Sequence, residues 1–260
     1  MESSILSPRE IRRYGKQIMI PEIGIAGQEK LKQAKVLVVG AGGLGCPVLQ
    51  YLTAAGVGKI GIAEFDMVDE TNLQRQILYG SPDIGKLKAI IAKNRLEHLS
   101  HLTEIEVFNL RIENRNSLKI FSEFDIIVDA TDNFKARYVI SDSCVILGKA
   151  LVHGSIYKYE GAVSVFNFKG GPTYRCYNPE PPAGKHKNPA ASEVGLFGVL
   201  PGITGTMMAN EVIKIITETG EVLSGKVLIF NILKYSFNIF TVNNIPENHN
   251  IKELKQEEPK

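Results

Sequence analysis

The stretch that decides the fold is Lys35-Val-Leu-Val-Val-Gly-Ala-Gly-Gly-Leu-Gly45. Its first half is apolar and rich in β-branched side chains, as in a strand buried on both faces of a parallel sheet. The glycines satisfy the G-x-G-x-x-G pattern, in which a tight turn brings the backbone to a phosphate at the N-terminus of the next helix. Such loops are followed about 20 residues later by an acidic residue that holds ribose hydroxyls. Glu64 and Asp66 stand there, so the stretch predicts a nucleotide-binding unit.

The alternation of apolar strand and helix continues along the chain. Short apolar or alternating runs predict strands at residues 59–64, 104–108, 125–129 and 150–153. Helices are expected between them, at residues 44–55, 84–99 and 134–147. Strands that alternate with helices indicate a sheet covered by helices on both faces. The sequence therefore predicts an α/β fold with a Rossmann-like, doubly wound, mostly parallel sheet.

After residue 155 the pattern changes. Residues 161–168 alternate like an antiparallel strand, and residues 169–192 are rich in Gly, Pro, Lys and Asn, as in a loop. A helix is expected at 203–218 and a hairpin at 226–231 and 235–242. This part is expected to extend the sheet with C-terminal antiparallel strands.

The chain is expected to form one domain over residues 1–260, since no linker or repeat interrupts it. Residues 1–34 are expected to be a helical segment that opens with a capping box of Ser7 and Glu10 around Pro8. Residues 245–260 are polar and rich in Lys and Glu, so a disordered tail is expected there.

Composition excludes several classes of protein. The chain has 30 Lys and Arg against 28 Asp and Glu, for a net charge of +2, which argues against nucleic-acid binding by bulk charge. No apolar run reaches the roughly 18–20 residues of a membrane span, and the N-terminus has no signal-peptide core. The three cysteines, Cys46, Cys144 and Cys176, are too few for a disulfide framework. A cytoplasmic location is expected.

Charged residues after the second and fourth strands point to a triphosphate. Thr71-Asn-Leu-Gln-Arg75 and Lys88 follow the second strand, and a triphosphate needs such cations more than a dinucleotide does. Asp132 follows the fourth strand, where a carboxylate can hold Mg²⁺. The plain alternatives are surface cations for Arg75 and Lys88, and a helix N-cap for Asp132 or Asn133.

These motifs in this order resemble the MoeB/ThiF/HesA adenylyltransferases, bacterial relatives of ubiquitin-activating enzymes. The resemblance runs from about Arg13 to about Phe240. Besides the glycine loop, Asn-Leu-Gln-Arg-Gln and Ala-Thr-Asp-Asn, it includes Arg13-Tyr-Gly-Lys-Gln17, Gly24-x-x-Gly-Gln-x-Lys-Leu31 and Gly198-Val-Leu-Pro-Gly202.

The resemblance implies an ATP-binding adenylation domain. It implies that the C-terminal glycine carboxylate of a ubiquitin-like sulfur carrier, which ends in Gly-Gly, attacks the α-phosphate of Mg-ATP and releases pyrophosphate. It also implies a homodimer. The roles carried over are nucleotide packing by Gly43, ribose binding by Glu64 beside Asp66, an ATP-site lining of Thr71, Asn72, Leu73, Gln74 and Arg75, phosphate neutralisation by Arg75 and Lys88, Mg²⁺ binding by Asp132, and completion of the site by Asn133.

Two departures from the family pattern concern charged residues. The ribose acid is usually Asp where this chain has Glu64. Lys16 replaces an arginine that in the family reaches across the dimer to the partner's ATP. Lysine keeps the charge but lacks the bidentate fork, so weaker screening of phosphate is expected.

Two further departures concern cysteines. Many members bind zinc through two Cys-x-x-Cys pairs, but the first pair is Thr173 and Cys176 here and the second is missing. One thiolate cannot build a tetrahedral site, so zinc is not expected. Some members carry a cysteine for a covalent carrier link where this chain has Ala191. Sulfur delivery is therefore expected from a separate donor, a rhodanese or a cysteine desulfurase.

Other functions stay open on sequence alone. A nicotinamide-dependent oxidoreductase could use the same glycine loop, although Arg75, Lys88 and Asp132 disfavour it. Activation of a peptide carboxylate in other chemistry and a non-catalytic binding module are further alternatives. The helix expected around residues 203–216 could face a partner subunit or belong to the core.

Overall fold

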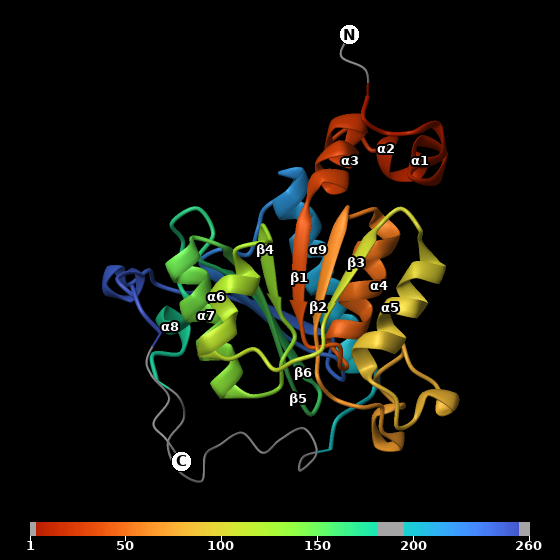
Figure 1. The fold of residues 1–260 in the computed structure, drawn as a ribbon. Coiled ribbons are helices and arrows are strands. Elements are labelled where there is room, and N and C mark those ends of the chain that lie inside the picture. The colour runs from red at the N-terminus through yellow and green to blue at the C-terminus, as the bar shows by residue number, and fades with distance from the viewer. Residues whose placement is uncertain (1–3, 181–194, 255–260) are drawn as a thin grey trace.

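A computed structural model describes residues 4–180 and 195–254. Its centre is one sheet of eight strands in the order β3-β2-β1-β4-β5-β6-β7-β8 (Figure 1). The strands are β1 Lys35–Val39, β2 Lys59–Ala63, β3 Glu104–Phe108, β4 Ile126–Asp129, β5 Ala150–Tyr157, β6 Glu160–Phe166, β7 Lys226–Asn231 and β8 Ser236–Thr241. The pairs from β3 to β5 are parallel and those from β5 to β8 antiparallel. The expected mixed α/β sheet is confirmed.

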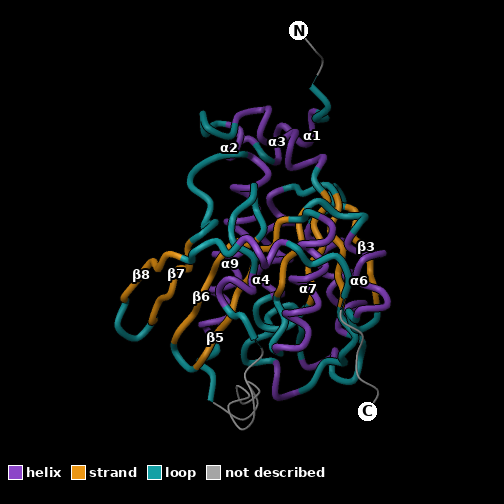
Figure 2. The backbone as a smooth tube through the Cα atoms, turned by 90° about the vertical axis from the view of Figure 1, so that its left-hand side faces the viewer, coloured by secondary structure: helices purple, strands orange, loops and turns teal. Residues whose placement is uncertain are grey.

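Helices cover both faces of the sheet. The described α-helices are α1 Pro8–Arg13, α2 Gly15–Ile18, α3 Gly24–Gln33, α4 Gly45–Ala55, α5 Lys88–Leu99, α6 Asn114–Phe121, α7 Phe134–Leu147, α8 Tyr174–Tyr177 and α9 Val199–Thr217. One buried cluster joins α4, α5 and α9 to the sheet, and a second joins α6 and α7 to its other face. Figures 1 and 2 show the two layers.

Strand β1 shows why the apolar run at residues 36–39 folds as it does. Val36 and Val38 belong to one buried cluster, whereas Leu37 and Val39 belong to the other. Each face of the strand therefore buries apolar surface. Such burial stabilises the fold by about 25 cal/mol for each Å² removed from water. A strand in this position must be apolar at successive residues, which explains the unbroken run.

The order of the parallel strands creates a crevice at one edge. The chain runs outward from β1 to β2 and β3, and then crosses back to β4 on the other side of β1. Ligands in such sheets bind where the strand order reverses, outside the carboxyl ends of the strands. The glycine loop follows β1 and Ala130–Asn133 follow β4, so both lie at this reversal.

Three expectations about local structure are corrected. The helix expected from residue 84 begins at Lys88, because Gly85 adopts φ +78° and Leu87 pairs with Met67 in an isolated bridge. The expected loop at 169–192 contains α8, and the amphipathic helix α6 was not foreseen.

The N-terminal segment forms the expected helices, and the predicted capping box is present: the Ser7 side chain accepts from Glu10 N–H. The helices α1 to α3 stand at the top of Figure 1, beyond the amino end of β1. The disordered tail expected from residue 245 is corrected for its first residues, and residues 255–260 lie outside the described part of the chain. Residues 246–249 form a 3₁₀ turn, and Asn248 Nδ2 donates to Cys176 Sγ at 3.5 Å.

Candidate nucleotide-binding site

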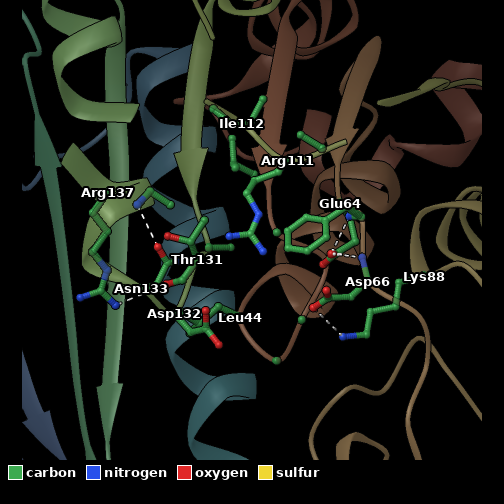
Figure 3. Close-up of a pocket in the computed structure, with 18 of the residues that line it drawn as sticks. Leu44, Glu64, Asp66, Lys88, Arg111, Ile112, Thr131, Asp132, Asn133 and Arg137 are labelled. Atoms are coloured by element: carbon green, nitrogen blue, oxygen red, sulfur yellow. Dashed lines mark hydrogen bonds and ion pairs between the residues drawn. The ribbon is translucent and has the colours of Figure 1, made fainter. Parts of the chain in front are cut away.

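A cavity of about 890 Å³ opens at the carboxyl ends of the parallel strands (Figure 3). Of the residues predicted for the site, those that line it are Gly43, Glu64, Asp66, Asn72, Arg75, Lys88, Asp132 and Asn133. They come from segments that follow β1, β2 and β4. Motifs separated by nearly a hundred residues therefore share one cavity.

The glycine loop forms the floor of the cavity, and two of its glycines have a steric requirement. Gly40 adopts φ +96°, and a side chain there would lie 2.8 Å from the Ala130 carbonyl oxygen. A Cβ on Gly45 would lie 2.0 Å from the carbonyl oxygen of Gly40. Helix α4 begins directly after this turn and has no side-chain N-cap. Its first N–H groups and the positive end of its dipole are thus suited to an anion.

Glu64 is tied to the backbone around the loop. Its carboxylate is almost fully buried and accepts from Ala41 N–H at 2.9 Å, from Phe65 N–H at 2.8 Å and from Asp66 N–H at 2.9 Å. Sequence spacing predicted a ribose ligand here and missed this role. Asp66, two residues on, is 53% exposed and faces the cavity (Figure 3).

Lys88 is a buried cation held by two neighbours. Its Nζ donates to Asn72 Oδ1 at 3.1 Å and lies 3.6 Å from Asp66 Oδ2. Asn72 Oδ1 also accepts from Gln76 Nε2 at 2.8 Å, so Gln76 fixes the amide that orients the lysine. Gln76 lines the cavity as well and was not predicted as a site residue.

Arg75 lines the cavity, whereas its predicted neighbours Thr71, Leu73 and Gln74 do not. The Arg75 guanidinium donates to the Thr71 carbonyl at 3.0 Å and makes no ion pair within residues 4–180 and 195–254. Leu73 packs on the core, and Gln74 lies against Gly198, where a Cβ would meet its side-chain oxygen at 2.5 Å. These neighbours support the segment that presents Arg75.

The sequence offered two roles for Asp132 and Asn133, a helix N-cap and a ligand of Mg²⁺, and the structure gives the N-cap to Asn133. Asn133 caps α7, because its side chain accepts from Ala136 N–H at 2.9 Å. Asp132 is exposed and has no hydrogen-bond or ion-pair partner in the described part of the chain. Its carboxylate therefore remains available to a ligand or cation in the cavity.

A buried hydrogen-bonded pair, Asp129 and His153, lies next to this turn. Asp129 accepts from His153 Nδ1 at 2.9 Å through one oxygen and from the Thr131 N–H and hydroxyl through the other. Burial lowers the pKa of His153, outweighing its bond to Asp129. Burial alone would raise the pKa of Asp129, but its hydrogen bonds, led by that from His153, hold it below the ordinary value. Neutral histidine beside ionised aspartate is thus favoured.

Two arginines line the cavity that the sequence did not single out. Arg111, from the crossover between β3 and α6, lies 4.4 Å from the centre of the exposed Phe65 ring. Arg137, from α7, is 8% exposed. Neither belongs to a motif, and their presence at the site depends on chain crossovers that residue spacing does not reveal.

Lys16 does not line the cavity. It is exposed on α2, beyond the amino end of the sheet, whereas the cavity lies at the carboxyl ends (Figure 1). Within its own chain the structure therefore leaves it apart from the other predicted residues.

The surroundings of Cys176 do not fit a zinc site. Its Sγ contacts Thr173 Oγ1 at 3.5 Å and accepts from Ile245 N–H at 3.4 Å and from Asn248. Burial alone would raise the pKa of Cys176, but these hydrogen bonds lower it. Across residues 4–180 and 195–254, no group of three or more His, Cys, Asp or Glu could hold a metal ion.

The other two cysteines were expected to belong to the core. Cys46 and Cys144 are fully buried core residues, as predicted, and burial raises the pKa of both thiols. Ala191 lies outside the described residues. Among the helices that are described, none is long and apolar enough to cross a membrane.

A glycine loop between β1 and α4, acidic residues after β2 and several cations around one cavity are typical of a nucleotide-binding α/β protein. The model of the ThiF family matches residues 14–251, and the chain belongs to that family. The fold matches the crystal structure of E. coli MccB with MccA-N7isoASN at a TM-score of 0.81 and 22% identity, covering 94% of this chain and 75% of that one.

Curated relatives are more similar in sequence. The sulfur carrier protein adenylyltransferase of Thermus thermophilus is 46% identical over 242 residues, which cover 91% of this chain and 89% of that protein. A probable molybdopterin-synthase adenylyltransferase of Porphyra purpurea is 46% identical over 236 residues, covering 91% of this chain. A probable adenylyltransferase/sulfurtransferase MoeZ of Mycobacterium tuberculosis is 42% identical over 256 residues, covering 97% of this chain. This chain spans only 62% and 65% of the last two.

Proposed function

We propose that the protein adenylylates the C-terminal glycine carboxylate of a ubiquitin-like sulfur carrier, with ATP as donor and pyrophosphate as product. The observation that carries the proposal is the meeting of the glycine loop, Arg75, Lys88 and the free Asp132 carboxylate in one cavity. Family membership supports it, as do relatives that are named adenylyltransferases, one of them for a sulfur carrier protein.

The chemistry is an in-line displacement at the α-phosphorus. A carboxylate oxygen of the carrier forms the new bond, while the bond to the bridging oxygen of the β-phosphate breaks and its electrons leave with pyrophosphate. No proton transfer is required. Positioning and neutralisation of charge therefore supply most of the rate.

The geometry supports specific roles for the residues that would hold the nucleotide. Gly43 and the positive end of the α4 dipole meet the phosphates, and Arg75 and Lys88 neutralise the departing pyrophosphate. Glu64 accepts from three backbone N–H groups and so holds the loop. One side of its carboxylate is left for a ribose hydroxyl. The exposed Asp66 carboxylate offers a second ribose contact.

Asp132 suits the magnesium ion that accompanies ATP. Carboxylates are preferred Mg²⁺ ligands, and Mg²⁺ is commonly bound by one or two carboxylates together with substrate phosphates. The unpartnered Asp132 side chain lies beside the glycine loop in Figure 3. When bound, the ion would neutralise developing charge on phosphate oxygens. We infer no zinc ion, since Cys176 lacks the further thiolates of a tetrahedral site.

Lys16 belongs to a proposed dimer. Since it lies apart from its own cavity, the site would be completed by Lys16 of a second copy. Complementation tests this arrangement. Lys16→Ala and Asp132→Ala, each inactive, should regain activity when their subunits are mixed, because one site per mixed dimer receives both intact residues. Failure to regain activity despite subunit exchange would contradict the arrangement.

Sulfur transfer would be completed by a separate donor, a rhodanese or a cysteine desulfurase. This inference rests on Ala191 at the position of a linking cysteine and on the core location of Cys46 and Cys144. Mass spectrometry after a single turnover should then find free carrier adenylate and no carrier joined to the enzyme.

ATP–pyrophosphate exchange tests the proposed function. Labelled pyrophosphate should enter ATP only with Mg²⁺ and a carrier ending in Gly-Gly, and not with a carrier shortened by those glycines. Absence of exchange with a panel of such carriers would refute the proposal. Tight NADH binding would instead favour an oxidoreductase.

A further inference from the structure

Arg137 is a buried cation that lacks an anion. Its side chain lines the cavity at 8% exposure. One guanidinium nitrogen donates to the Thr131 carbonyl at 3.3 Å, and the group lies 5.1 Å from the centre of the Phe134 ring. Its Nε has no hydrogen-bond partner, and no ion pair to Arg137 exists in residues 4–180 and 195–254.

The buried Asp129 carboxylate attracts Arg137 but is not bonded to it directly. Asp129 exerts an electrostatic effect on Arg137, but it accepts from His153 through one oxygen and from Thr131 through the other. The hydroxyl of Tyr174, fully buried beside this cluster, makes no well-aligned hydrogen bond, and nearby Arg137 opposes the rise that burial causes in the pKa of Tyr174. A buried guanidinium at a cavity wall that has no carboxylate bonded directly to it is suited to a ligand with negative charge.

The proposed reaction brings two anionic groups to the cavity, the phosphates of ATP and the terminal carboxylate of the carrier. The position of Arg137 indicates which of them it meets. In Figure 3, Arg137 lies on one side of Thr131 and Asp132, whereas Glu64, Asp66 and Lys88 lie on the other. On that other side, Glu64 and Asp66 are the residues proposed to bind the ribose, and Lys88 is proposed to neutralise the pyrophosphate. Tyr157 and Lys158, at the β5–β6 turn, also line the cavity.

In an in-line displacement the attacking oxygen arrives opposite the leaving group. If the pyrophosphate lies near Lys88, a carboxylate that attacks opposite to it would approach from the side of Arg137. A guanidinium can bind a carboxylate through two parallel N–H groups.

We propose that Arg137 binds the terminal carboxylate of the carrier and directs one of its oxygens at the α-phosphorus of ATP. The inference rests on the proposed function and adds to it the residue that recognises the acceptor. Arg137 accepts no proton and forms no covalent bond. Its contribution is to hold the nucleophile in place.

A thermodynamic cycle on binding tests the contact. Two synthetic hexapeptides that end in Gly-Gly, one a free acid and one an amide, would be titrated into protein saturated with a non-hydrolysable ATP analogue. Wild type should prefer the acid by about ten- to a hundredfold, the range for a hydrogen-bonded charged pair. Arg137→Gln should remove this preference, and Arg137→Lys should keep part of it.

The cycle separates recognition from a structural role. Loss of the bond to Thr131 alone would weaken binding of the acid peptide and of the amide peptide equally. The ratio of their two dissociation constants would then stay unchanged. Arg95→Gln, a change of the same kind at a surface ion pair with Asp83, should also leave the ratio unchanged. An unchanged ratio in Arg137→Gln, or no acid preference in wild type, would overturn the inference.

The proposed function fails on a different measurement. If wild type shows no pyrophosphate exchange with any carrier, the function is wrong even where the peptide preference holds. If exchange is normal and the acid preference persists in Arg137→Gln, only the assignment of Arg137 is wrong.

Discussion

Replacing Glu64 by Gln tests whether this side chain holds the glycine loop. One Glu64 oxygen accepts from both Phe65 and Asp66 N–H, and the other accepts from Ala41 N–H. In Glu64→Gln the amide oxygen can keep one set of bonds. The amide NH₂ must then face a backbone N–H, which leaves a buried donor without an acceptor.

Loss of a hydrogen bond to a charged group costs about 1.5–3 kcal/mol. For a chain of this size that corresponds to a melting temperature lower by roughly 3–12 °C. Urea unfolding followed by circular dichroism measures the free energy directly. Glu70→Gln is the matched control, because Glu70 is exposed and a change there should stay within about 0.5 kcal/mol.

The result that would refute this reasoning is an unfolding free energy for Glu64→Gln as close to wild type as the control. Glu64 would then serve only as a ligand contact. Weaker ATP binding with unchanged stability would support that simpler role.

Three further predictions follow from the same geometry. Asp132→Ala should lower pyrophosphate exchange by about 10²–10³-fold and leave the unfolding free energy within about 0.5 kcal/mol, since its carboxylate has no partner in the described chain; retained exchange would remove it from the site. Gly45→Ala, whose Cβ would meet Gly40 O at 2.0 Å, should lower stability by about 1–3 kcal/mol and weaken ATP binding in calorimetry, whereas Gly202→Ala, with open space around it, should do neither. Because the folded-state pKa of His153 lies below 6.5, only the unfolded chain gains that proton as pH falls through 6.5, and stability is lost by up to about 1.4 kcal/mol per pH unit. His153→Gln should reduce this slope in urea unfolding between pH 7.5 and pH 5, and an equal slope would count against the buried neutral histidine.

Much of the fold could be predicted from the sequence because its signals are local. The apolar run at residues 36–39 and the glycines after it specify a strand, a turn and a helix within a few residues of one another. The N-cap of α7 could be narrowed to Asp132 or Asn133 for the same reason. The start of α5 was missed because it depends on a bridge between Leu87 and the distant Met67.

The site could be predicted only where its residues lie in motifs. Spacing placed Glu64 after β2 but could not show that its oxygens bond to backbone N–H groups, which depends on three-dimensional packing. Arg111 reaches the cavity from the crossover between β3 and α6, and Arg137 reaches it from the first turn of α7. A lone arginine in either segment has no pattern that separates it from a surface cation.

The central claim is that a carrier carboxylate attacks the α-phosphorus of ATP. Isotope transfer tests it most directly. A carrier whose terminal carboxylate bears heavy oxygen is incubated with the protein and Mg-ATP, hydroxylamine cleaves the adenylate at its carbonyl carbon, and the AMP released is weighed by mass spectrometry. We expect one heavy oxygen in each AMP. AMP without the label, or ADP as the product, would contradict adenylylation of the carrier.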